Sequence, residues 1–146
     1  MKNINKLFYT ILFVLVVFTQ GFSQCRDLNN ILCMKKLDPF IFNGQHNRMV
    51  LTDSTRAELN LTFYGGQKYR VYICSEDKIG KIEFTLYDAN QKEIFSNRNF
   101  NYVSYWDFVS KTTQKITLDV NVAKDQKEKP KAKSGCVSIL IGFKQP

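Results

Sequence analysis

Cysteine and histidine are the residue types in this chain that could support nucleophilic catalysis or bind a metal ion. The chain contains one histidine, His46, which lies beside the turn signal Asn43-Gly44. Its four cysteines are Cys25, Cys33, Cys74 and Cys136. A thiol nucleophile needs a basic partner, and only His46 could be that partner for Cys74. Zinc sites use paired ligands at short spacing, and the sequence has no C-x-x-C. We therefore predict no catalytic residue, no metal ligand and no cofactor, and expect the protein not to be an enzyme.

An even number of cysteines in an exported chain indicates disulfide bonds. Three pairings of the four cysteines are open. We expect Cys74 to pair with Cys136, because one ends a predicted strand and the other begins the last predicted strand. Cys25 and Cys33 then remain for each other. An ideal helix would hold their α-carbons about 12 Å apart, which exceeds disulfide reach, so this pair requires Cys25 to lie outside the helix.

The N-terminus has the pattern of a secretory signal peptide. Lys2 and Lys6 precede an apolar run over residues 7–18, and small residues follow up to Ser23. We predict a signal peptide over residues 1–23 and one mature domain over residues 24–146.

Export would place the protein in the periplasm or outside the cell. A lipid anchor on Cys25 is the alternative, but Phe22 and Gln24 occupy positions where that signal usually has an aliphatic and a small residue. No second apolar run approaches the length of about 18 residues that a transmembrane helix needs.

The charge of the chain bears on its partners. The full chain has 21 basic and 13 acidic residues. This balance favours a polysaccharide or an anionic surface as partner, and ordinary solubility charge is the alternative interpretation. Another secreted protein is a further candidate partner. Nucleic acid is not expected as a partner of an exported protein.

Five segments alternate apolar and polar residues with period two, which predicts half-buried strands. They cover residues 56–64, 68–74, 81–88, 114–123 and 136–143. Shorter strands are expected around residues 48–52, 91–97 and 102–108. Gly65-Gly66 and the turn at residues 88–91 are expected to close hairpins.

Before these strands, apolar residues at helical spacing predict a short helix near residues 26–37, ended by Asp38-Pro39. Residues 123–135 read as a basic loop between the last two strands. The predicted fold is mainly β. It is an antiparallel, jelly-roll-like β-sandwich of about eight strands, between about residues 48 and 144, with one short N-terminal helix.

The most aromatic stretch, "NFNYVSYWDF", begins at Asn99. Tyr102, Tyr105 and Trp106 are a candidate ligand platform if they are exposed together. The alternative is that Trp106 fills the core of the sandwich, as large aromatic side chains commonly do.

Three segments carry a family resemblance: the G-Q-x-Y-R segment from Gly66, the W-D-F segment from Trp106, and S-G-C-V-S from Ser134. Together they resemble a family of small, uncharacterised secreted proteins of Gram-negative bacteria. More loosely, the "GGQKY" and "YDAN" turns are similar to those of bacterial pre-peptidase C-terminal domains, which are jelly-roll sandwiches. The resemblance implies no catalytic residue. We interpret the chain as a secreted or periplasmic, non-enzymatic domain with a binding or accessory role. A structural cell-surface protein and a hydrolase of unrecognised type are the alternatives.

Overall fold

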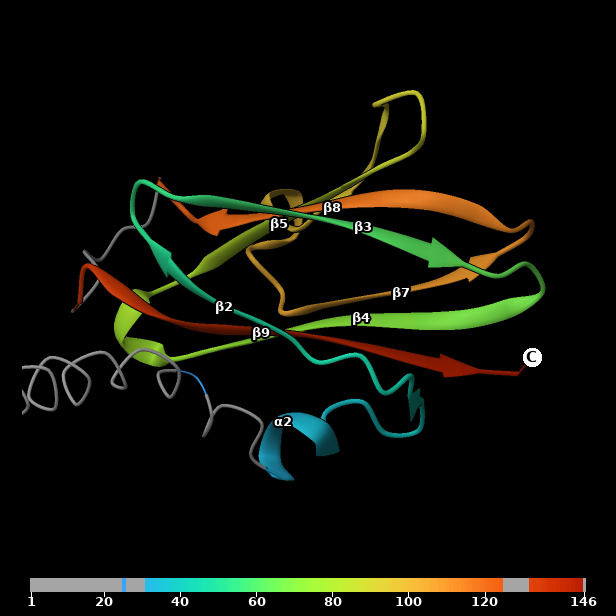
Figure 1. Ribbon diagram of the computed structural model, residues 1–146, viewed down its shortest axis with the longest axis horizontal. Coiled ribbons are helices and arrows are strands. Elements are labelled where there is room, and N and C mark those ends of the chain that lie inside the picture. The colour runs from blue at the N-terminus through green and yellow to red at the C-terminus, as the bar shows by residue number, and fades with distance from the viewer. Residues whose placement is uncertain (1–24, 26–30, 125–131, 146) are drawn as a thin grey trace, which may run out of the picture.

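Two antiparallel sheets face each other across one hydrophobic core in the computed structural model, which describes Cys25, residues 31–124 and residues 132–145 (Figure 1). Sheet A contains β1 (Ile41–Phe42), β2 (Asn47–Thr52), β9 (Ser134–Lys144), β4 (Gln67–Ser75) and β7 (Tyr105–Ser110). Sheet B contains β3 (Arg56–Phe63), β8 (Gln114–Val122), β5 (Ile82–Tyr87) and β6 (Glu93–Ser96). The predicted signal peptide, residues 1–23, lies outside the described residues.

The strand pairings are nested. β2 pairs with β9, β3 with β8, β4 with β7 and β5 with β6. These four pairs are those of one long antiparallel hairpin centred on the β5–β6 turn. When this hairpin curls into two sheets, β4 also pairs with β9 and β5 with β8. This order is that of a jelly roll, so the fold prediction is confirmed. Within the described residues the sandwich has nine strands rather than about eight, because the two-residue β1 also pairs with β9.

The core forms from the residues that alternation assigns to the inner faces of the strands. Phe63 of β3, Val71 of β4, Phe84 of β5 and Leu118 of β8 are each 1% exposed or less. These positions belong to one cluster that joins both sheets. Period-two patterning therefore identifies the face of each strand that the sandwich buries.

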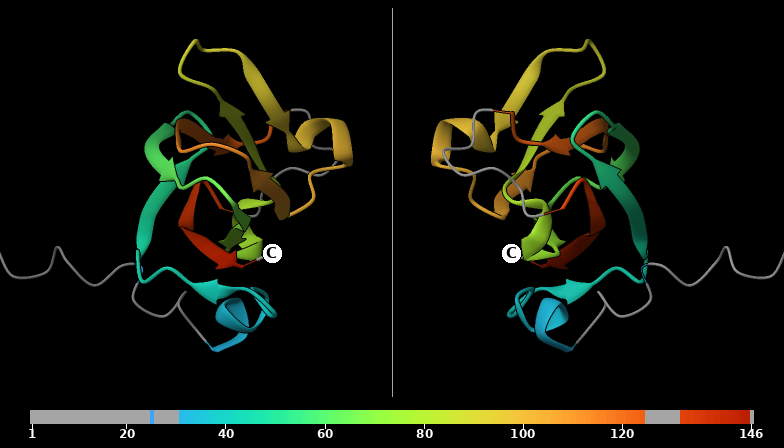
Figure 2. Two further views of the ribbon diagram at one scale, coloured as in Figure 1. Left: turned by 90° about the vertical axis from the view of Figure 1, so that its right-hand side faces the viewer. Right: turned by 90° about the vertical axis from the view of Figure 1, so that its left-hand side faces the viewer.

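The N-terminal segment forms a third layer over the outer face of sheet A. It contains α2 (Ile31–Lys35) and the buried side chains of Leu37 and Phe40. Leu140 alternates with the core residues Ile139 and Ile141 of β9, yet it is also fully buried. A Cβ atom at Gly142 would lie 2.7 Å from the Cβ of Phe40, so this close approach requires glycine. The end-on views show α2 beneath sheet A, with sheet B on the opposite side (Figure 2).

The glycine pair Gly65-Gly66 does not close a hairpin, and that prediction is wrong. The chain crosses here from β3 in sheet B to β4 in sheet A. Gly66 has φ of +79°, and a Cβ atom at Gly65 would lie 2.9 Å from the Cα of Thr112. The glycines thus permit a tight crossing against the β7–β8 connection. The other predicted hairpin is confirmed, since β5 and β6 pair with each other.

Two other predictions are only partly covered by the described residues. The helix predicted near residues 26–37 is described over Ile31–Lys35, and residues 26–30 lie outside the description. Of the basic loop predicted over residues 123–135, residues 125–131 lie outside it. Within the described ranges, no helix has the length and apolar character to cross a membrane.

Candidate functional site

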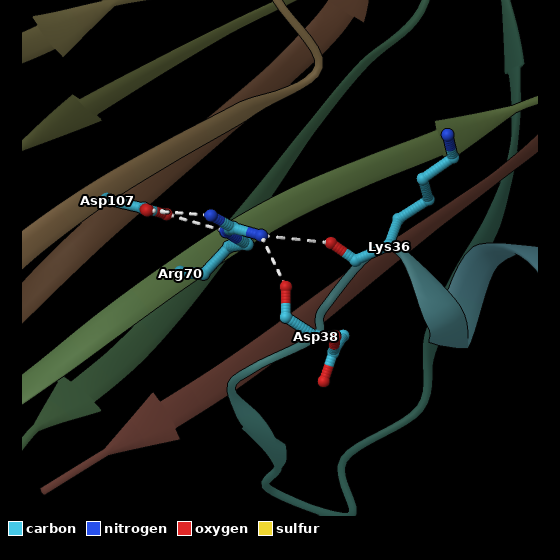
Figure 3. Close-up of polar contacts among 4 residues, drawn as sticks. All are labelled: Lys36, Asp38, Arg70 and Asp107. Atoms are coloured by element: carbon cyan, nitrogen blue, oxygen red, sulfur yellow. Dashed lines mark hydrogen bonds and ion pairs between the residues drawn. The ribbon is translucent and has the colours of Figure 1, made fainter.

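Arg70, on β4, ties the N-terminal segment to sheet A (Figure 3). Its Nε and Nη2 atoms donate to the two carboxylate oxygens of Asp107 on β7, at 2.7 and 2.8 Å. Its Nη1 atom donates to the backbone oxygens of Lys36 and Asp38, at 3.1 and 3.2 Å. The hydrogen bonds to Asp107 raise the pKa of Arg70. Bidentate, charge-assisted pairs are among the strongest polar contacts in proteins, so this cluster has a structural role.

Two aromatic rings complete the surroundings of Arg70. Its guanidinium carbon lies 4.6 Å from the ring centroid of Phe40 and 4.8 Å from that of Tyr105. Such distances allow cation–π attraction to both rings. Tyr105, one of the candidate platform residues, therefore contacts Arg70 on the outer face of sheet A.

The four cysteines form two disulfides, but the expected pairing is wrong. Cys25 pairs with Cys136, and Cys33 pairs with Cys74, with Cα–Cα distances of 5.5 and 6.1 Å. β4 and β9 are antiparallel neighbours, but Cys74 lies opposite Ser138, so Cys136 is in a diagonal position. Diagonal neighbours on a sheet face are about 7–8 Å apart, which is beyond the usual disulfide distance. The N-terminal segment crosses this face and supplies a partner for each strand cysteine.

A catalytic pairing of Cys74 with His46 is incompatible with this arrangement. The Cys74 sulfur is bonded to Cys33. His46 is exposed, and its ring centroid lies 4.9 Å from that of Phe42. Among the described residues, no group of three or more His, Cys, Asp or Glu side chains could hold a metal ion.

The three candidate platform residues lie in different surroundings. Trp106 packs against the core, stacked between Phe95 and Phe108 at centroid distances of 4.8 and 4.4 Å. Tyr102 follows the 3-10 turn Asn97–Phe100, with the Lys81 ammonium group 5.4 Å from its ring centroid. Tyr105 contacts Arg70 instead. The structure therefore does not bring these three rings together on one surface.

One surface cleft, which we call the charged cleft, has a volume of about 230 Å³, and its lining includes Arg56, Arg98, Lys124 and Glu83. Arg98 and Glu83 form an ion pair at 3.3 Å. Arg56 forms an ion pair with the buried Asp119. Two of the three basic groups in this lining therefore already have carboxylate partners.

Another cleft, which we call the uncharged cleft, lies where the ends of β3 and β9 approach the start of β4. Its volume is about 260 Å³. It is lined by Asn43, Thr62, Tyr64, Gln67, Tyr69, Ile141 and Phe143. No lining residue carries a formal charge, although 23% of the residues in the chain do. The cleft thus combines aromatic and aliphatic surface with hydroxyl and amide groups.

The Tyr69 hydroxyl organises the floor of the uncharged cleft. It accepts a hydrogen bond from the backbone N–H of Tyr64 at 3.0 Å and donates one to the side-chain oxygen of Gln67 at 3.2 Å. Tyr69 is 5% exposed, and its ring meets Phe63 edge-on at 4.8 Å. Since the Gln67 oxygen is fixed by Tyr69, the amide NH₂ is the group left to bind a ligand. Tyr64 lies at the surface of the cleft, with 62% of its area exposed, whereas Tyr69 beneath it is buried.

The sequence prediction did not single out the residues of the uncharged cleft. Tyr64 read only as the end of a strand. One feature of the sequence does distinguish Tyr64. Like Thr62, it lies on the polar side of an alternating segment, next to a glycine turn, and this position exposes its large aromatic ring to solvent. Gln67, Ile141 and Phe143 come from two other strands, and only the fold brings them to Tyr64.

No family model and no curated protein sequence matches this chain. Among solved structures, the chain is similar to PliG from Aeromonas hydrophila, a periplasmic lysozyme inhibitor of g-type lysozyme. The TM-score is 0.49 at 14% sequence identity, over 68% of this chain and 85% of PliG. Similarity at this level supports no inference about what this chain binds.

Proposed function

We propose that this protein is an exported, non-enzymatic domain that binds an uncharged ligand in the uncharged cleft. The observation that carries the proposal is the composition of the lining. Seven residues from four separate segments meet there, none of them is charged, and aromatic and hydrogen-bonding groups are interleaved. Small-molecule sites have this character: mostly apolar walls with a few placed polar groups.

The rigidity of the cleft floor supports the same proposal. The Tyr69 hydroxyl fixes both the backbone at Tyr64 and the amide orientation of Gln67. The side chain of Asn43 is held too, because its amide donates to Gln45 and its oxygen accepts from the Gln45 backbone N–H. A ligand would therefore meet groups that are already ordered, which lowers the entropic cost of binding.

Export is supported by the signal-peptide pattern and by the disulfides, since structural disulfides form in oxidising compartments. The pairing of Cys25 with Cys136 also bears on the alternative of a lipid anchor. A sulfur atom in a disulfide cannot carry a thioether-linked lipid. We therefore propose that the protein lies in the periplasm or outside the cell, without a lipid on Cys25.

The proposal is tested by mapping ligand contacts on the mature, oxidised protein. Amide NMR spectra are recorded with neutral oligosaccharides, acidic oligosaccharides and uncharged peptides, and each ligand is recovered and analysed by mass spectrometry. The expected result is a set of shifts centred on Tyr64, Gln67 and Phe143, with the ligand recovered intact. Shifts centred on the charged cleft, or cleavage of a ligand by the protein, would contradict the proposal.

A further inference from the structure

We propose, resting on the proposed function, that the ligand of the uncharged cleft is a neutral saccharide, with one sugar ring placed against Tyr64. The two aromatic side chains at the cleft surface provide the first argument. Tyr64 is 62% exposed and Phe143 is partly buried. The C–H face of a sugar ring packs on the face of an aromatic ring while its hydroxyl groups remain free for hydrogen bonds.

The polar groups at the cleft provide the second argument. The amide NH₂ of Gln67 and the hydroxyl of Thr62 form no hydrogen bond with any residue that the structure describes. The amide donates, and the hydroxyl both donates and accepts. Sugar hydroxyl groups also donate and accept, so they can satisfy both groups at once. A purely apolar ligand would leave them unbonded.

The absence of charge in the lining and the volume of the cleft further limit the class of ligand. An anionic polysaccharide would gain from cationic side chains at its binding site, and the lining has none. The volume of about 260 Å³ is slightly below the range of about 300–1,000 Å³ typical of small-molecule pockets. The cleft therefore suits one ring of a saccharide, with the rest of a longer chain lying outside it.

The test uses the mature, oxidised protein and three substitutions in the cleft. Tyr64→Ala removes the stacking surface. Thr62→Val removes a hydroxyl at constant shape. Gln67→Glu keeps an oxygen that can accept from Tyr69 but replaces the donating NH₂. Phe100→Ala is the matched control, because Phe100 is also a largely exposed aromatic residue, 56% exposed, and does not line the cleft.

Binding is measured by titration calorimetry with gluco-, manno-, xylo- and chito-oligosaccharides. Acidic oligosaccharides and uncharged aromatic peptides are the comparison ligands. We expect a neutral oligosaccharide to bind, Tyr64→Ala to weaken binding at least about tenfold, Gln67→Glu and Thr62→Val to weaken it several-fold, and Phe100→Ala to leave it unchanged. Unchanged thermal unfolding and amide spectra outside the cleft confirm that each variant is folded.

The remaining outcomes separate this inference from the proposed function. If a peptide or an acidic oligosaccharide shifts the amide resonances of the cleft residues and no neutral saccharide does, the assignment of the ligand as a neutral saccharide is overturned. In the peptide case the proposed function stands. If a neutral saccharide binds equally to wild type and Tyr64→Ala, the assignment of this site is overturned. If no ligand class shifts the cleft residues, both proposals are contradicted.

Discussion

The guanidinium of Arg70 and the carboxylate of Asp107 form two parallel hydrogen bonds across β4 and β7, at 2.7 and 2.8 Å. The same guanidinium holds the backbone of the N-terminal segment, through the carbonyl oxygens of Lys36 and Asp38. One side chain thus joins β7, an edge strand of sheet A, to the N-terminal segment. The planar geometry of arginine is essential for this, because an ammonium group cannot make the same four bonds.

Arg70→Lys should therefore destabilise the protein by about 1–2 kcal/mol, although the positive charge remains. The measurement is the free energy of unfolding in urea. Arg48→Lys is the control, because Arg48 is exposed on β2 and should change stability by less than about 0.5 kcal/mol. Equal free energies of unfolding for Arg70→Lys and wild type would show that the hydrogen bonds of Arg70 to the N-terminal segment and to Asp107 contribute nothing to stability.

The two disulfides should connect Cys25 to Cys136 and Cys33 to Cys74 in peptide maps made without reduction. They span 111 and 41 residues, so in the chain-entropy model they stabilise by about 5 and about 4 kcal/mol respectively. Replacing either pair with serines should produce losses of this order. A peptide linking Cys74 to Cys136 would contradict the path of the N-terminal segment.

Asn97 is a fully buried polar side chain with three hydrogen bonds. Its oxygen accepts from the backbone N–H of Phe84 at 2.9 Å, and its amide donates to the carbonyls of Ile82 and Val103 at 2.9 and 3.0 Å. Asn97→Ala should cost about 2–4 kcal/mol, since it leaves buried backbone groups without partners. Asn99→Ala is the matched control, because Asn99 is exposed in the same turn. Similar unfolding midpoints for the two variants would refute this role.

Glu76 should make stability depend on pH. Its side chain accepts a hydrogen bond from the backbone N–H of Cys136 at 2.7 Å and lies 3.1 Å from the ammonium group of Lys78. These contacts lower the pKa of Glu76 from its ordinary value of 4.5, and the bond from Cys136 is the largest cause. A lowered pKa in the folded state means that the unfolded chain binds the proton more readily. The stabilising effect is therefore present above pH 4.5 and is lost as the pH falls through the folded value.

The corresponding experiment compares wild type with Glu76→Gln in urea unfolding at neutral and acidic pH. The wild type should be more stable at neutral pH, and the difference should shrink below pH 4.5. Glu93→Gln provides the reference, because Glu93 is exposed on β6. A difference that stays constant down to acidic pH would mean that the Glu76 carboxylate contributes nothing through its charge.

The sequence was sufficient to predict the sandwich because alternation reports which face of a strand is buried. Phe84 and Leu118 lie in the core as their spacing requires. The alternation of apolar and polar residues does not show with which other strand a given strand pairs. Gly65-Gly66 signals a reversal equally well for a hairpin and for a crossing between sheets, and here it is the crossing.

The cysteine pairing could not be derived for a related reason. Leu140 has the spacing of an outward residue of β9, yet it is fully buried, and two residues along the same face Phe40 approaches Gly142. The sequence does not show that this segment lies on sheet A, and the same contact brings Cys33 to Cys74. The uncharged cleft is not predictable from the sequence because Tyr64 follows β3 while Gln67 and Phe143 belong to β4 and β9, and only the fold brings these residues together.

Two of the segments quoted in the sequence analysis have clear physical roles. In the segment from Gly66 to Arg70, the glycine permits the crossing, Gln67 and Tyr69 form the floor of the cleft, and Arg70 holds the N-terminal segment. In the segment that begins at Trp106, the next residue, Asp107, is the partner of Arg70.

Stacking of a neutral sugar ring on Tyr64 would bring the sugar protons close to the ring protons, so it can be tested by intermolecular NOEs. They are recorded between aromatic ring protons of the folded, oxidised protein and the carbon-bound protons of a bound neutral oligosaccharide. We expect NOEs from Tyr64 and Phe143 to one face of a single sugar ring, and none from Tyr105 or Phe100. A saturating neutral oligosaccharide with NOEs to Tyr105 or Phe100, and none to Tyr64, would contradict this expectation.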